Sequence, residues 1–244
     1  MEFPILTIVF SLIAYGAAAI FAVGFAAKVI KYARTPSPLK IPTTPAPTTS
    51  FGVVLRVLGD VLLFKSLYKG NKWTWVGGII FHYTFLLVVL RHLRYFLYPV
   101  PGFIMALQDY GIYAAYILPL AVLYLLMRRT TVDRTVFISS LADYFALALI
   151  FGIAVTGLLM KYYVRPFMVD VKGFIYGLVT LNPSSVPLEP VFLLHLLLVC
   201  TLLAYFPFSK LMHAGGIFFS PTRTQTDTPR ERRHVNPWSP NLSA

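Results

Sequence analysis

Long runs of apolar residues, separated by polar and charged stretches, divide the chain into five segments. The runs cover about residues 5–30, 76–98, 105–127, 137–160 and 190–212. Each is close to the ~20 residues that an α-helix needs to cross ~30 Å of hydrocarbon. Helices are expected in lipid because a helix satisfies its own backbone hydrogen bonds. The pattern therefore predicts an all-α, polytopic membrane protein, built as a five-transmembrane-helix bundle.

The connection between the first two runs has two parts. Residues 35–50 are rich in Pro and Thr and are expected to be irregular or extended. Residues 51–69 place apolar side chains on one helical face, which predicts an amphipathic helix on the membrane surface. A short helix packed on the bundle fits the same pattern. The apolar face comprises Val54, Leu58, Val61 and Leu62, and the interrupting charges are Arg56, Asp60 and Lys65.

The composition supports a membrane protein and excludes several kinds of site. Only 12% of the residues are charged, against roughly 25% in a soluble domain, and the mean hydropathy is +0.72. The net charge of +12 does not indicate nucleic-acid binding, because the basic residues lie between the apolar runs. The single cysteine, Cys200, cannot hold an iron–sulfur cluster, and no C-x-x-C-H motif for c-type haem is present. Cys200 is expected to pack as a small hydrophobe.

The 21 Lys and Arg residues are distributed unevenly between the two sides that five spans define. Five lie on the side of the N-terminus, and the other sixteen lie on the opposite side. Because positive residues stay in the cytoplasm, we expect a multi-pass protein of the cytoplasmic membrane, with its N-terminus outside and its C-terminus inside. The five outer residues are Arg91, Arg94, Lys161, Arg165 and Lys172.

Four of the five histidines fall in or next to two of the spans. His82 and His92 lie in the second, and His195 and His213 lie in or next to the fifth. Since these two spans run in opposite directions, matching depth pairs His82 with His213 near the inner face. It pairs His92 with His195 near the outer face. The axial separations are ~15 Å and ~27 Å in continuous helices, and a kink at Pro207 would reduce the difference.

Two facing imidazoles at each of two depths favour bis-histidine haem. Each pair can supply both axial ligands of a haem iron, and the macrocycle fills the apolar gap between helices two and five. Zinc would need three or four clustered ligands. A proton relay would normally include intramembrane carboxylates, of which Asp143 is the one candidate. The pattern predicts two b haems that form an electron route across the membrane, with no catalytic residue assigned and with the iron ligands His82, His92, His195 and His213.

Other kinds of protein could carry the same histidines. A histidine-relay proton channel or transporter would be colourless and would show a pH-dependent flux. A passive membrane anchor for a soluble enzyme would leave activity unchanged when any of the four is replaced. Histidines that only form hydrogen bonds in a helical core would also hold no cofactor.

Cationic residues at the span ends are candidate partners for the anionic haem propionates. Arg91, Arg94 and Lys161 lie at the outer side, and Arg56 and Lys210 lie at the inner side. Each could instead be a boundary charge that extends to the lipid headgroups.

The histidine pattern resembles the gamma subunit family of respiratory nitrate reductase. Two histidines are ten residues apart in the second of five spans, within FHYTFLLVVLRH, and two are eighteen apart at the fifth. The resemblance implies a dihaem cytochrome b that exchanges electrons with a quinone, either menaquinone or ubiquinone. It also implies the same two ligand pairs that the antiparallel geometry predicts.

The resemblance further implies a quinone pocket near the outer haem. Such a pocket needs an apolar slot and one or two hydrogen-bonding groups. Gln108, Asp109 and Tyr110 lie at that depth in the third span, which contains no lysine. The three outer cations named above are further candidates for quinone contacts.

Two other stretches resemble the DsrM-type cytochrome b subunits of DsrMKJOP complexes in sulfur metabolism. They are FSKLMHAGGIFFSPTR at 208–223 and RRHVNPWSPNLSA at 232–244. This resemblance implies a DsrK-like, heterodisulfide-reductase-like iron–sulfur partner on the cytoplasmic side. It also implies a multihaem cytochrome c, a ferredoxin-like protein and a second membrane subunit. The chain would then be an electron-transfer subunit of a quinone-linked oxidoreductase complex, with the direction of electron flow left open.

The chain is expected to divide into a membrane domain and a tail. Residues 1–220 form the transmembrane domain, which includes the cytoplasmic linker and amphipathic helix at 35–75, and residues 221–244 form a polar tail. The tail is either solvated or a docking strip for a cytoplasmic partner, with Trp238 as an anchor. His234, in this tail, is given no role in a site.

Overall fold

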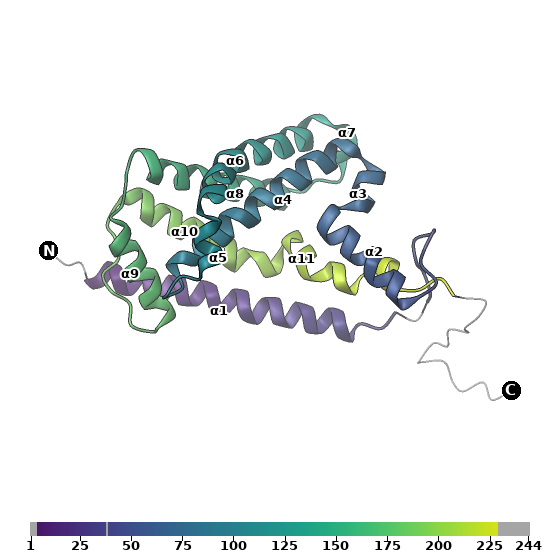
Figure 1. The fold of residues 1–244 in the computed structure, drawn as a ribbon, viewed down its shortest axis with the longest axis horizontal. Helices are drawn as coiled ribbons and strands as arrows, with labels where there is room; N and C mark the ends of the chain where they lie inside the picture. Colours follow the sequence, from purple (N-terminus) through teal and green to yellow (C-terminus); the bar gives the residue numbers. More distant parts are fainter. Residues whose placement is uncertain (1–3, 38, 229–244) are drawn as a thin grey trace.

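The computed structural model describes residues 4–37 and 39–228, and these residues form helices and loops without a strand (Figure 1). Five helices are long and apolar enough to cross a membrane. This confirms the predicted all-α fold with five candidate spans. The helices are α1 (Pro4–Arg34), α4 (Lys72–His92), α6 (Gln108–Thr131), α8 (Leu141–Tyr162) and α10 (Pro190–Tyr205).

Shorter elements connect the long helices. The short α-helices are α2 (Ser50–Leu63), α3 (Lys65–Gly70), α5 (Gly102–Ala106), α7 (Asp133–Phe137), α9 (Met168–Val179), α11 (His213–Gly216) and α12 (Pro221–Thr224). The 3-10 turns are η1 (Leu93–Tyr95), η2 (Phe206–Phe208), η3 (Lys210–Met212) and η4 (Ile217–Phe219).

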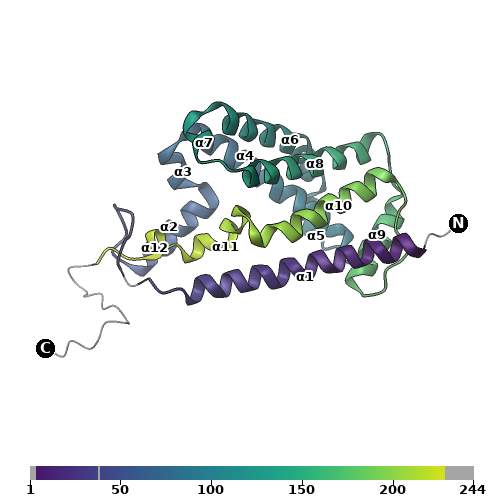
Figure 2. The ribbon, with the colours of Figure 1, turned by 180° about the vertical axis from the view of Figure 1, so that it is seen from behind.

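Each long helix packs against one or two of the others. α4 packs on α6, α6 on α8, α8 on α10, and α10 on α1 (Figure 2). The helices α4 and α10 do not pack closely against each other along their length. Apolar side chains such as Ile5, Leu12 and Val23 of α1 are exposed on the outside of the bundle. In a chain with five such helices, the exposed apolar surface is the surface that lipid covers.

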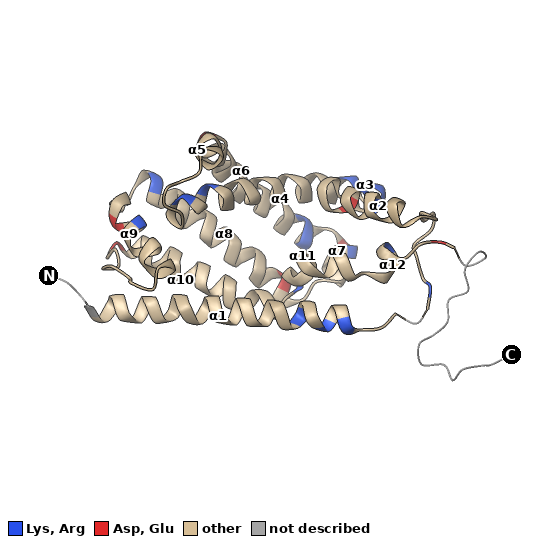
Figure 3. Ribbon diagram, turned by 60° about the horizontal axis from the view of Figure 1, so that its bottom comes forward, with Lys and Arg blue, Asp and Glu red and all other residues tan. Residues whose placement is uncertain are grey.

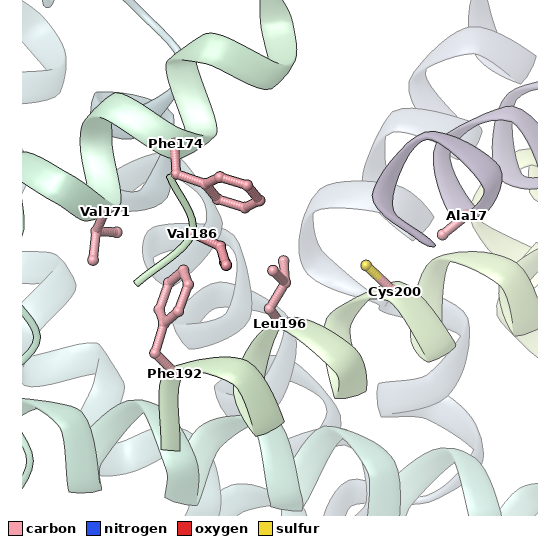
Figure 4. Packing of buried hydrophobic residues seen from close by; sticks show 7 residues of the cluster. All are labelled: Ala17, Val171, Phe174, Val186, Phe192, Leu196 and Cys200. Carbon is pink, nitrogen blue, oxygen red and sulfur yellow. The ribbon is translucent and has the colours of Figure 1, made fainter. Parts of the chain in front are cut away.

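Two apolar clusters hold the bundle together. One joins α1, α9 and α10, where Phe174 is fully buried and Cys200 faces Ala17 (Figure 4). Cys200 is therefore a packed core residue, as the sequence predicts. The other cluster joins α6 and α8 through Leu118, Val122 and Ile150.

The fifth span ends earlier than predicted. The apolar run extends to residue 212, but α10 ends at Tyr205 and the 3-10 turn η2 follows. Pro207 lies in that turn, and its missing N–H cannot continue the helical hydrogen bonds. Ser209 is then extended, with φ −119° and ψ 175°. The sequence predicts a kink at Pro207, and the structure ends the α-helix there, so that His213 is reached through irregular backbone.

The segment at 51–69 differs from its prediction in being two helices rather than one. It forms two helices, because Phe64 between α2 and α3 is in the left-handed region with φ 50°. The predicted apolar face is exposed at Val54, Leu58 and Leu62, whereas Asp60 is buried. α2 lies against α12 and α3 lies against α4. This segment therefore packs on the bundle, as one of the two predicted arrangements has it, and buries Val53, Gly59 and Asp60 of α2.

Basic residues gather at one end of the bundle. Figure 3 shows most Lys and Arg at the end that holds α2, α3, α12 and the C-terminal end of α1. The described chain starts and finishes at opposite ends of the bundle (Figure 1), as five spans require. We refer to the basic end, which holds α12, as the inner end, and to the other as the outer end. Trp238 and His234 lie outside the described residues.

Candidate functional site

The four histidines of the spans lie in two pairs, one at the middle of α4 and the other at its C-terminal end. The ring centroids of His82 and His213 are 5.9 Å apart, and those of His92 and His195 are 6.4 Å apart. The first two rings are almost perpendicular, at 86°, and the other two are almost parallel, at 15°. These are the pairs that depth matching predicts from the sequence. They bridge α4 to α10 and to the segment after it, where the helices themselves are not closely packed.

The outer pair is fixed by hydrogen bonds at Nδ1. His92 Nδ1 lies 2.7 Å from the carbonyl oxygen of Val88, one turn earlier in α4. His195 Nδ1 lies 2.9 Å from Thr156 Oγ1 on α8. The Thr156 hydroxyl already donates its one proton to the carbonyl of Gly152, at 2.7 Å. With its proton directed to this carbonyl, the hydroxyl oxygen accepts from His195, which assigns a proton to Nδ1 of His195.

The inner pair has the same arrangement at Nδ1. His82 Nδ1 is 2.7 Å from the Gly78 carbonyl oxygen, and His213 Nδ1 is 2.8 Å from the Lys210 carbonyl oxygen. Because a carbonyl only accepts, both Nδ1 atoms carry their proton. The Phe64 ring, at the break between α2 and α3, has its centroid 4.9 Å from that of His82.

This donor set fits a metal ion held between the rings of each pair. Within residues 4–37 and 39–228, no Nε2 atom of these four histidines has a hydrogen-bond partner, so each keeps a lone pair for a ligand bond. A hydrogen bond at the other nitrogen is the usual support of a metal-binding histidine. With metal–nitrogen distances of about 2 Å, two imidazoles on one metal have centroids roughly 6 Å apart. Among the described residues no three His, Cys, Asp or Glu side chains cluster as metal ligands, which leaves pairs only.

The outer cations lie close to aromatic and amide groups. Arg91 donates to the backbone carbonyl of Gln108 at 3.1 Å, and Arg94 donates to the side-chain carbonyl of Gln108 at 2.9 Å. Lys161 lies over the rings of Tyr116 and Tyr162, at 5.8 and 5.9 Å from their centroids. The two arginines thus bind the start of α6, and Lys161 lies further along it.

A groove opens on the outer half of α6. Its volume is ≈ 600 Å³, and three of its six lining residues are tyrosines. Of the candidates chosen by depth, Asp109 and Tyr110 line it, whereas Gln108 binds Arg91 and Arg94 instead. The lining residues are Ala106, Asp109, Tyr110, Ile112, Tyr113 and Tyr116.

The inner cations named from the sequence already have protein partners. Lys210 forms an ion pair with Asp143 at 2.7 Å, and Arg129 lies 3.5 Å from the same carboxylate. Asp143, the one candidate carboxylate for a proton relay, therefore pairs with two basic residues. Arg56 donates to the Thr43 carbonyl at 2.8 Å.

A second ion pair, outside the spans, joins α2 to α12. Arg223 binds the buried carboxylate of Asp60 at 2.6 Å, and the Ser66 hydroxyl and backbone N–H donate to it at 2.7 and 2.9 Å. Burial by itself would raise the pKa of Asp60 through desolvation. The hydrogen bonds from Ser66 and the charge of Arg223 outweigh this, and the pKa is lowered from its ordinary value of 3.8.

Thr156 is the site residue that the sequence analysis missed. It lies in the apolar run AVTGLLM, next to Gly157. A Cβ at Gly157 would lie 3.5 Å from Cε1 of His195, so α8 approaches the ring closely there. A polar and a small residue together in an apolar span were the available signal.

The comparisons with known proteins agree with this architecture. The family model of the nitrate reductase gamma subunit matches residues 65–226, which hold all four site histidines. The chain belongs to the nitrate reductase gamma subunit family. The resemblance seen in the histidine spacing is thereby confirmed.

Two proteins from Archaeoglobus species are similar to almost the whole chain. One, from Archaeoglobus fulgidus, is 37% identical and aligns with 94% of this chain and 82% of its own length. The other, from Archaeoglobus profundus, is 35% identical and aligns with 96% of this chain and 83% of its own length. Each carries the name Hdr-like menaquinol oxidoreductase cytochrome b-like subunit.

Proposed function

We propose that this protein is a dihaem b-type cytochrome subunit that moves electrons across a membrane between a quinone pool and a cytoplasmic iron–sulfur partner. The proposal rests on the two histidine pairs. In each pair the Nδ1 atoms form hydrogen bonds, and the Nε2 atoms have no hydrogen-bond partner among the described residues. His82 and His213 would hold the inner haem, and His92 and His195 the outer one. A b-type haem supplies an iron that accepts and donates single electrons.

We place the quinone site in the groove of α6. Three tyrosines there, Tyr110, Tyr113 and Tyr116, offer rings for stacking and hydroxyls for a quinone carbonyl. Asp109 supplies a carboxylate that accepts a proton when a quinol is oxidised. Menaquinone is the proposed quinone, because both archaeal relatives are named for menaquinol.

The proposed setting is a DsrMKJOP-like or heterodisulfide-reductase-like complex in the cytoplasmic membrane. The relatives' names include an Hdr-like oxidoreductase, and the basic inner end suits a cytoplasmic location (Figure 3). The N-terminus is then outside, and the iron–sulfur partner meets the inner end near His213. The multihaem cytochrome c, ferredoxin-like and second membrane subunits complete the proposed complex.

The haem content of the purified chain tests the proposal. We expect two b haems per chain by the pyridine haemochrome method, and one in each of His82→Ala and His92→Ala. His234→Ala, in the tail, serves as the control and keeps both. If the protein is folded but colourless after expression with haem available, the proposal is refuted, and a histidine proton relay becomes the preferred function.

A further inference from the structure

We propose that Asp143, on α8, is a positioning residue that holds His213 in place through Lys210. This inference rests on the proposed function, because His213 is taken as a ligand of the inner haem. Asp143 touches no ligand itself, and its effect is on the orientation of the ring.

His213 needs such support because of where it lies. His82, His92 and His195 are all within long α-helices, where the helical backbone fixes their direction. His213 begins the four-residue helix α11, after two 3-10 turns and an extended Ser209. The regular hydrogen bonds of α10 therefore do not reach it, and other contacts must hold its backbone.

Lys210 supplies these contacts with its two ends. Its carbonyl accepts from His213 Nδ1 at 2.8 Å, and its ammonium binds Asp143 Oδ2 at 2.7 Å. The carbonyl determines the direction of the ring, and the ammonium ties the same residue to α8. Loss of the ion pair would therefore free the backbone whose carbonyl orients the imidazole.

Asp143 is itself held firmly. It is buried, and it caps the start of α8 by accepting from the backbone N–H and hydroxyl of Ser140, at 2.9 and 3.0 Å. Tyr205, at the end of α10, donates to the carbonyl of Ala142 at 3.0 Å, which ties the two helices at the same level. The first turn of α8 is thus a fixed point beside the irregular segment.

Positioning and simple electrostatics predict opposite results for two variants. Lys210→Met removes a positive charge, so through charge alone it would lower the inner haem potential. Asp143→Asn removes a negative charge, so through charge alone it would raise that potential. If the pair positions His213, both variants release the same tether and move the inner haem in the same direction. The Asn side chain keeps an acceptor oxygen for the helix cap, which favours folding of the variant.

The two haems can be observed separately in one sample. Nearly perpendicular axial rings, as in the inner pair, and nearly parallel rings, as in the outer pair, give different low-spin ferric electron paramagnetic resonance signals. We expect both variants and the double variant to broaden or shift the inner signal and to leave the outer one unchanged. Retention of the inner haem should weaken roughly tenfold, as for other lost supports of a metal ligand. Lys210→Arg keeps the positive charge and should give the signal of the unmodified chain. Lys31→Met, in the last turn of α1 at the inner end, removes one positive charge without touching this tether and is the control for charge.

Two results would overturn the inference. One is an unchanged inner signal and potential in both variants. The other is a pair of opposite potential shifts with an unaltered signal shape, which would assign a purely electrostatic effect. Absence of haem from the unmodified chain would instead refute the proposed function, and with it the ligand role of His213.

Discussion

At the scale of single residues, the hydrogen bond between Thr156 on α8 and His195 on α10 links two helices. A neutral hydrogen bond of this kind contributes about 1 kcal/mol. Its larger effect is electronic, because an acceptor at Nδ1 increases the electron donation of the imidazole to a bound metal. Thr156 therefore belongs to the outer site through its hydrogen bond to His195, although it would not contact a bound haem itself.

The variant Thr156→Val tests this role with little change of shape. We expect the outer haem to bind roughly tenfold more weakly and to have a higher potential, since the ligand is then a weaker donor. The inner haem should keep its potential. A redox titration followed by haem absorbance measures both. Thr201→Val is the matched control, because Thr201 donates only to the Leu197 carbonyl of its own helix. An equal shift of both haems would contradict a local role.

The pairing of the four histidines could be predicted from the sequence, but the residues that hydrogen-bond to them or hold them in place could not. Antiparallel spans and equal depth predicted which imidazoles lie together. The partners of Thr156 and Asp143 depend on contacts 39 and 67 residues away along the chain. No periodicity encodes such contacts, because they arise only when the bundle closes. Lys210 was assigned to a propionate for this reason, since its carboxylate partner was not visible in the sequence.

At the scale of elements, α1 approaches the irregular segment after α10 at one glycine. A Cβ on Gly24 would lie 2.7 Å from Cβ of Pro207, which is fully buried and rigid. Neither side can yield without moving a backbone. This contact sets the separation between α1 and the turn that leads to His213.

We expect Gly24→Ala to destabilise the inner site selectively. Overpacking of this kind costs about 1–3 kcal/mol, and the turn at Pro207 should shift, so that the inner haem is lost at a lower temperature. Gly16→Ala is the matched control on α1, because a Cβ there meets nothing within 4 Å. Thermal loss of each haem signal measures the effect. Equal behaviour of the two variants would show that the close approach has no consequence.

The ion pair of Asp60 and Arg223 holds α2 and α3 on α12 in a pH-dependent way. The folded-state pKa of Asp60 is below 3.8. The stabilisation is therefore present above that ordinary value and disappears as the pH falls through the lower folded value. In the Asp60→Asn variant, the backbone amide hydrogens of α12 should exchange with solvent faster than in the unmodified chain at neutral pH. In strong acid the two proteins should exchange these hydrogens at the same rate.

Hydrogen exchange read by mass spectrometry, corrected for the intrinsic pH dependence, measures this difference. Asp133→Asn in α7 is the control and should leave α12 unchanged. A difference that grew as the pH fell would contradict the assigned sign.

The elements themselves were mostly predictable. Apolar runs of span length are a strong signal, since lipid admits only helices here. The sequence predicts the break at Pro207 but not the one at Phe64, where a left-handed residue separates α2 from α3. Hydropathy could not reveal the break at Phe64, because no glycine or proline marks it.

At the scale of the whole molecule, the unequal charge of the two ends predicts one orientation in the membrane. We expect the loop at 182–189 outside and the linker at 39–49 inside. In a Cys200→Ala background, Ser185→Cys should react with an impermeant thiol reagent on intact cells, and Thr48→Cys should react only after lysis. Both positions are exposed, so access to the side chain does not limit the reaction. The reverse pattern would invert the proposed placement of inner and outer haem.

The early end of α10 has a consequence for which insertions and deletions the sequence tolerates. In a continuous helix, one inserted residue turns everything after it by about 100°, which would remove a ligand from its partner. Between His195 and His213 the chain leaves the helix at Tyr205, so insertions or deletions at 206–209 need not rotate His213 with α10. The eighteen-residue spacing is therefore not dictated by helical register. The position of His213 is set instead by the turn at Pro207, which packs on Gly24 of α1, and by Lys210, which reaches Asp143 on α8.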